Sequence, residues 1–191
     1  LNAAQGTSTT GGSSTVPGGT STVGFRPTTG MSCATTTVGS SGLNGTAGSI
    51  ATMTQLSQYS SEEIGAGQTD IKVLGTDIKA SNDGDIALTS MKLVFDSSAN
   101  ASGDSDRLTD YISSVSVWMG STKVATVSAS DFSKEDTGIY KKVVTLSNAV
   151  VRSDKTEKFY VSVDAVSNLD SGDIDSDSWS VAIENIRVLD G

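Results

Sequence analysis

Apolar and polar residues alternate along most of the chain after residue 62. In residues 157–166, for example, Phe159, Val161 and Val163 fall on one side and polar residues fall on the other. Alternation with a period of two predicts half-buried β-strands. Turn-forming residues such as those at 81–84 separate these runs. The expected strands are residues 69–80, 85–96, 111–120, 122–127, 139–147, 157–166 and 177–189.

Two places interrupt the alternation. Gly75 divides the apolar positions of the first run, which predicts a bulge or an edge kink at this glycine. Residues 128–138 predict a turn or a single helical turn around Phe132. No convincing long helix and no tandem repeat follows from the pattern. Seven or eight short strands separated by turns predict an all-β fold, an antiparallel β-sandwich of immunoglobulin-like size, with a jelly roll as the alternative.

The first 61 residues have a different composition. They are rich in Thr, Ser and Gly, contain both prolines, and carry one charge, on Arg26. The other 12 of the 13 basic residues and all 22 acidic residues follow from Glu62 onward. We therefore expect an extended low-complexity segment at 1–61, an inter-subunit strand or a linker, and a β-sandwich domain at 62–191.

Parts of the N-terminal segment have the pattern of an added β-strand. In 21–27, Val23 and Phe25 fall on one side, as required of an extended peptide that adds to a sheet edge and fills alternate pockets. Residues 49–56 are a second candidate. The sequence leaves open whether the segment docks on its own chain or on a neighbour. The expected anchors are Val16, Val23, Phe25, Ile50, Met53 and Leu56.

The composition excludes several function classes. A net charge of −9 and a pI near 4.3 argue against nucleic acid or an anionic membrane as the main partner. No apolar run reaches the roughly 18 residues of a bilayer-spanning helix. Histidine is absent, which removes Ser-His and Cys-His nucleophile pairs and the usual general base near neutral pH. We therefore expect no enzyme.

The remaining reactive groups do not change this expectation. Cys33 is the single cysteine, so no intrachain disulfide can form, and we expect a small half-buried apolar residue. The chain begins with Leu1 rather than Met, and we expect a processed or trimmed piece of a longer protein. Four carboxylates, predicted to be a charged surface rather than an acid–base pair, are Glu62, Glu63, Asp110 and Glu135.

An acidic loop at 170–179 is the candidate metal site. Its carboxylates suit Ca²⁺, and Glu184 stands where an EF-hand loop places its bidentate ligand. Ser178 replaces the required glycine, so a solvated loop is the favoured interpretation and calcium the alternative. A second, weaker loop contains Asp96, Asp104 and Asp106 and could lie at the same end of the sandwich. The candidate ligands are Asp170, Asp173, Asp175 and Asp177.

The N-terminal segment is also a candidate for glycosylation. Dense Thr and Ser between residues 7 and 46 suit O-linked glycans. Asn44 and Asn100 match the N-linked acceptor pattern. The candidate O-linked positions are Thr9, Thr10, Thr22, Thr28 and Thr29.

Two stretches of the body resemble a known group of proteins. "IKVLGTDIKASNDGDIALTSMKLVF" (71–95) has an apolar strand, a short turn and a strand ending in L-x-F. "LSNAVVRSDKTEKFYVSVDAVSNLDSGD" (146–173) has a short turn, a strand and an S-N-L-D loop. Together they resemble β-sandwich modules of large secreted surface proteins of candidate phyla radiation bacteria, and more loosely biofilm fibre proteins and archaeal bundling pilins. The resemblance implies a structural role in a surface layer, stalk or filament.

These observations favour a self-assembling extracellular structural subunit at the cell surface, with itself as partner. The alternative is an adhesin or a carbohydrate-binding sandwich that stacks ligands on exposed aromatic rings. A core position is the competing interpretation for Trp118 and Trp179. The aromatic residues in question are Trp118, Tyr111, Tyr140 and Tyr160.

Overall fold

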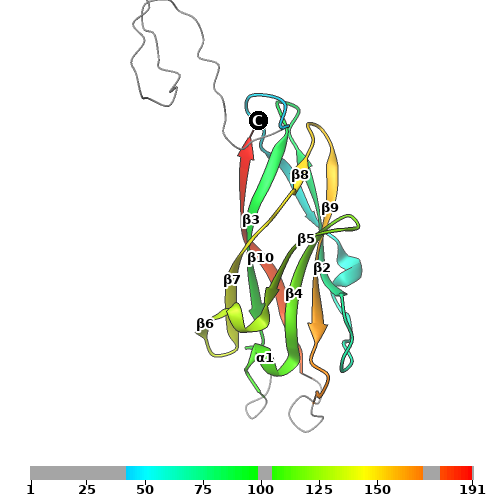
Figure 1. Cartoon of the computed structure of the whole chain (residues 1–191), viewed down its shortest axis with the longest axis vertical. Helices are drawn as coiled ribbons and strands as arrows, with labels where there is room; N and C mark the ends of the chain where they lie inside the picture. Colours follow the sequence, from blue (N-terminus) through cyan, green and yellow to red (C-terminus); the bar gives the residue numbers. More distant parts are fainter. Residues whose placement is uncertain (1–41, 99–104, 170–176, 191) are drawn as a thin grey trace, which may run out of the picture. The chain divides into compact units, whose positions relative to one another are not determined.

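The computed structural model describes residues 42–98, 105–169 and 177–190, which belong to one compact unit, Ser40–Gly191. This unit is an all-β antiparallel sandwich of two sheets, as predicted (Figure 1). The first sheet has the order β1-β2-β9-β4-β5. Its strands are β1 (Ile50–Gln55), β2 (Ile71–Ala80), β9 (Thr156–Ala165), β4 (Ile112–Met119) and β5 (Thr122–Ser128).

The second sheet has the order β10-β3-β7-β6, and the short strand β8 pairs with β3 beyond β7. Its strands are β10 (Ser180–Asp190), β3 (Ile86–Asp96), β7 (Ile139–Thr145), β6 (Ser133–Asp136) and β8 (Val150–Val151). Three short helices complete the described elements: η1 (Ser57–Tyr59), α1 (Leu108–Tyr111) and η2 (Ala129–Asp131).

The expected strands all form, and the stretch 128–138 is more structured than its sequence suggests. It holds both the single turn η2 and the strand β6, which pairs with β7. The last strand, β10, pairs with β3 and lies in the other sheet from β9. This order departs from the immunoglobulin arrangement, in which the last two strands are neighbours in one sheet.

The core lies between the sheets and follows the alternation of the sequence. Met91, Leu93 and Phe95 of β3 are buried against Val161 and Val163 of β9 and their neighbours. Burial of such side chains is the main favourable term in folding, at roughly 1.5–3 kcal/mol for each large one. The period-two pattern is therefore sufficient to identify the inward faces of the central strands.

The bulge predicted at Gly75 lies two residues earlier. In the β2–β9 register the step from Lys72 to Leu74 skips Val73, so Val73 is the extra residue. Gly75 has another role, because a Cβ there would lie 2.6 Å from the ring of Tyr59. The missing side chain lets Tyr59 pack edge-on against Tyr160, with centroids 5.4 Å apart and planes at 81°.

A second irregularity explains an odd spacing near the C-terminus. Apolar positions in β10 jump from Ile183 to Ile186, and the register with β3 shifts between Ile183 and Asn185. Glu184 is the extra residue. Its carboxylate pairs with Lys92 of β3 at 2.6 Å and with Lys141 of β7 at 3.3 Å.

Strand β1 lies inside the stretch that composition assigns to the N-terminal segment. It pairs antiparallel with β2 of its own chain, so the sheet extends past the boundary expected at residue 61. Charge density changes near residue 62, but backbone pairing does not depend on charge. The sandwich therefore includes residues with the low-charge composition of the N-terminal segment.

Asp85 links the first described residues to the loop that contains Arg152 and Ser153. Its carboxylate accepts hydrogen bonds from the backbone amides of Asn44 and Ser153, each at 2.8 Å, and pairs with Arg152 at 2.6 Å. The Asp85 side chain is 3% exposed. The amide of Ser153, the guanidinium of Arg152 and the amide of Asn44 lower its pKa from 3.8 to about 2.

Candidate functional site

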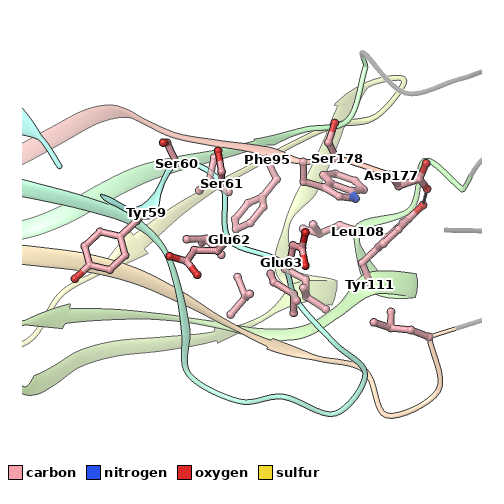
Figure 2. A pocket seen from close by; sticks show the side chains of 17 residues that line it. Tyr59, Ser60, Ser61, Glu62, Glu63, Phe95, Leu108, Tyr111, Asp177 and Ser178 are labelled. Carbon is pink, nitrogen blue, oxygen red and sulfur yellow. Dashed lines mark hydrogen bonds between the residues drawn. The ribbon is translucent and has the colours of Figure 1, made fainter. Parts of the chain in front are cut away.

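A pocket of about 680 Å³ opens between the two sheets at the end of the sandwich where β3 ends and β10 begins (Figure 2). We call it the end pocket. Both sheets contribute to it, through β2, β4 and β9 on one side and β3 and β10 on the other. Its volume lies within the range of about 300–1,000 Å³ that small-ligand sites occupy. The described residues that line it are Tyr59, Ser60, Ser61, Glu62, Glu63, Ile64, Val73, Phe95, Leu108, Tyr111, Ile112, Val163, Leu169, Asp177, Ser178, Trp179 and Val181.

The floor of the end pocket is apolar. Phe95, Leu108 and Val163 are buried there, and Ile112 lies beside them. Phe95 also packs edge-on against Phe132, with ring centroids 5.3 Å apart. This floor can accept an apolar group.

The mouth of the end pocket is acidic and rich in hydroxyl groups. Residues 60–63 supply Ser60, Ser61, Glu62 and Glu63, all of them exposed. Figure 2 shows the two glutamates between Tyr59 on one side and Leu108 and Tyr111 on the other. Among the described lining residues there is no lysine or arginine. The mouth is therefore suited to a cationic group.

Trp179 forms part of the wall and leaves a polar atom unsatisfied. Its ring packs against Tyr111, with centroids 5.3 Å apart, and against Tyr140 at 6.1 Å. Its indole Nε1 is buried and has no hydrogen-bond acceptor among the described residues. A buried N–H without a partner is uncommon, since its desolvation is not compensated. The wall of the end pocket therefore contains a buried N–H group that no described acceptor satisfies.

Asp177 also lines the end pocket, where it contacts Tyr111. The Tyr111 hydroxyl lies within hydrogen-bond distance of the Asp177 carboxylate and, at 2.7 Å, of the Ser105 carbonyl. Ser105 also donates its hydroxyl to Asp110 at 2.6 Å. This network joins the ends of the two acidic loops, which the sequence suggested could lie at one end of the sandwich.

The candidate calcium ligands are only partly described. Asp170, Asp173 and Asp175 lie outside the described residues, and so does Asp104 of the second loop. Asp106 pairs with Lys134 at 2.6 Å. No cluster of three or more metal-ligating side chains occurs within residues 42–98, 105–169 and 177–190. Calcium binding stays a prediction for the loop at 170–179.

The expected assembly anchors divide into two groups. Ile50 begins β1 and Leu56 directly follows it, and both are half-buried, whereas Met53 within β1 is exposed. Leu56 donates its backbone amide to the Gly75 carbonyl at 2.8 Å. These positions belong to a strand paired with its own chain. The other anchors, Val16, Val23 and Phe25, lie outside the described residues.

Among the candidate glycosylation positions, the structure describes only Asn44. Its side chain is exposed and its Nδ2 donates to Asp85 at 3.3 Å. Asn100 and Cys33 lie outside the described residues. The O-linked candidates Thr9, Thr10, Thr22, Thr28 and Thr29 also lie there.

The aromatic residues considered for carbohydrate stacking do not form an exposed row in the described part. Tyr111, Tyr140 and Tyr160 are buried. Trp118 is half-buried, donates to the Ser162 hydroxyl at 2.8 Å and lies under the Lys123 ammonium. Tyr160 is covered by Tyr59 and by the Lys72 ammonium, 3.9 Å from its ring centre.

Glu62 and Glu63 were predicted to lie on a charged surface, and nothing in the sequence connected them with Trp179. More than 110 residues separate the two walls of the end pocket in the sequence, so no local motif joins them. The single available signal was the cluster of two serines and two glutamates at residues 60–63, where the low-charge segment ends.

No family model matches the chain, and neither a curated protein nor a solved structure similar to it was found. None of the helices in the described ranges has the length and hydropathy needed to cross a bilayer. Any conclusion about function therefore depends on the sequence and on the geometry of the sandwich.

Proposed function

We propose that this chain is a structural subunit of an extracellular filament or surface array, joined by addition of its N-terminal segment as a β-strand to a neighbouring subunit. The observation that carries the proposal is the free edge of β10. This strand has 11 residues and lies at the end of its sheet, and among the described residues it pairs with β3 on one side only. Leu189 on this strand is 55% exposed. A long open edge is a template for another strand.

The first sheet provides a surface for such a strand to cover. Met53 of β1 is opposite Ile78 of β2, so both side chains face the inside of the sandwich. Ile78 is fully buried, whereas Met53 is 46% exposed. Strand β10, at the edge of the second sheet, contacts β2 across the sandwich. Because β1 lies outside β2 in the first sheet, β1 extends beyond that edge. A strand added to β10 would lie over Met53.

The chain contains a suitable donor. Residues 1–41 carry one charge, and their alternating Val23 and Phe25 fit a strand with two anchors. At about 3.3 Å per residue, such a segment spans far more than the length of one strand. Ordering it costs roughly 1–2 kcal/mol per residue in backbone entropy, which hydrogen bonds and apolar contacts with a neighbour can offset.

Truncation tests the proposal directly. The described sandwich lies entirely within residues 42–190, so a chain that begins at Gly42 retains every strand that the structure describes. We expect the full chain to form filaments or lattices in negative-stain electron microscopy and the truncated chain to remain as single particles. Circular dichroism confirms that the truncated sandwich is folded. A full chain that stays monomeric at high concentration contradicts the proposal.

A further inference from the structure

We infer that the end pocket is the receptor for the 21–27 segment of a second copy of this chain. Val23 and Phe25 enter the pocket, and Arg26 pairs with Glu62 and Glu63 at its mouth. The inference rests on the proposed assembly by strand addition and specifies where the donor is recognised.

The apolar floor matches the anchors of the donor. In an extended segment, residues two apart point to the same side and lie roughly 7 Å apart. Val23 and Phe25 therefore form one apolar face, and a pocket of about 680 Å³ has room for both side chains. The floor that would receive them contains Phe95, Leu108 and Val163.

Charge is the second line of support. Arg26 is the only charged residue in the first 61, and it directly follows the larger anchor. The mouth of the end pocket carries Glu62 and Glu63, and no described lining residue is basic. With Phe25 directed inward, Arg26 points toward the rim, where these exposed carboxylates lie. Pro27 favours an extended backbone at Arg26, because it excludes helical geometry at the preceding residue.

The position of the pocket at the start of β10 is the third line of support. Trp179 directly precedes β10, and Val181 of β10 lines the pocket. A segment seated in the pocket therefore continues naturally along the free edge of β10.

Charge reversal in the full chain tests this docking. Arg26→Glu makes the donor incompatible with the native mouth, and Glu62→Arg/Glu63→Arg makes the mouth incompatible with the native donor. We expect each variant alone to stay monomeric in analytical ultracentrifugation under conditions where the wild type assembles. An equimolar mixture of the two should assemble again, because every donor then finds a mouth of opposite charge on the other variant.

The matched control reverses two carboxylates elsewhere. Asp131 and Glu135 are exposed on η2 and β6 and do not line the end pocket. Asp131→Arg/Glu135→Arg changes the net charge as much as the mouth variant does, and we expect it to assemble like the wild type. Phe25→Ala should raise the concentration needed for assembly by about tenfold or more, as expected for loss of a buried aromatic anchor.

The outcomes separate this inference from the proposed function. A wild type that never assembles overturns the proposed function. If the wild type, the reversed variants and Phe25→Ala all assemble equally, assembly stands and the end pocket is not the receptor. If both reversed variants stay monomeric when mixed, the pairing of Arg26 with the mouth of a second copy is overturned. Restored assembly of the mixture supports docking between copies, because docking within one chain cannot be rescued by mixing.

Discussion

At the scale of single residues, the missing side chain of Gly75 determines where Tyr59 packs on the sandwich. The ring of Tyr59 occupies the space over its Cα, and a Cβ there would also lie 3.1 Å from Leu56. The ring contact between Tyr59 and Tyr160 depends on this space. Tyr59 in turn begins the segment that forms the mouth of the end pocket. A glycine in a strand thus determines where a distant segment lies.

We predict that Gly75→Ala destabilises the sandwich by about 1–3 kcal/mol, the usual cost of forcing extra atoms into a packed site. Urea unfolding followed by fluorescence measures this difference. Gly65→Ala is the matched control, because its nearest neighbour, the Gln68 side chain, is 3.5 Å away. Equal stability of the two variants would contradict the packing of Tyr59 against Gly75.

Asp85 gives a prediction about pH. Its pKa is lowered to about 2 by the amides and the guanidinium around it, against about 3.9 in an unfolded chain. A depressed folded pKa stabilises the fold above the unfolded value, and this contribution is lost as pH falls from about 4 toward 2.

We expect Asp85→Asn to be less stable than the wild type at neutral pH and the difference to shrink as pH approaches 2. Thermal unfolding over this pH range measures the effect. Asp83→Asn, at an exposed position in the same turn, is the control and should follow the wild type. A constant difference between Asp85→Asn and the wild type at every pH would contradict a role for the charge.

At the scale of elements, the pattern of the sequence predicted strands better than it predicted their partners. Residues 49–56 have the alternation of a strand, and β1 forms there. The sequence could not tell whether this strand pairs in its own chain, because β-pairing uses backbone groups that every residue carries. The bulge at Glu184 coincides with the gap between the apolar positions Ile183 and Ile186, where none was predicted, and the bulge at Val73 lies two residues before the glycine at which one was predicted.

The pairing of β1 predicts different results for two truncations. A chain that begins at Gly42 should keep nearly all the stability of the sandwich. A chain that begins at Glu62 loses β1 and η1, with the apolar contacts of Ile50, Leu56 and Tyr59, and should be less stable by at least about 3 kcal/mol.

Urea unfolding compares the two chains, and faster amide hydrogen exchange in β2 should accompany the second truncation. Similar stability in both would mean that β1 adds little to the sheet. The sandwich would then begin in practice near residue 62.

At the scale of the whole molecule, the proposed assembly is head-to-tail, with one donor and one acceptor on each subunit. Such heterologous contacts give open filaments when the rotation between subunits does not close a ring. A subunit without a donor can still accept one, and it then ends the filament. The chain that begins at Gly42 is such a subunit.

We predict that adding one truncated subunit for about every ten full-length subunits limits the mean filament length to about ten subunits. Electron microscopy of length distributions measures this effect. The truncated chain carrying Glu62→Arg/Glu63→Arg has neither a donor nor a native mouth, so it is the control and should leave filament length unchanged. Equal shortening by both truncated chains would contradict termination at the end pocket.

The sequence by itself determined the long strands, the inward faces of the central ones and the contrast between a low-charge N-terminal segment and an acidic body, because periodicity and charge are local properties of the chain. The tertiary structure decided that β10 pairs with β3, that β1 belongs to the sandwich, and that Glu62, Glu63 and Trp179 border one pocket. Those outcomes depend on contacts between residues far apart in sequence, which no local pattern encodes.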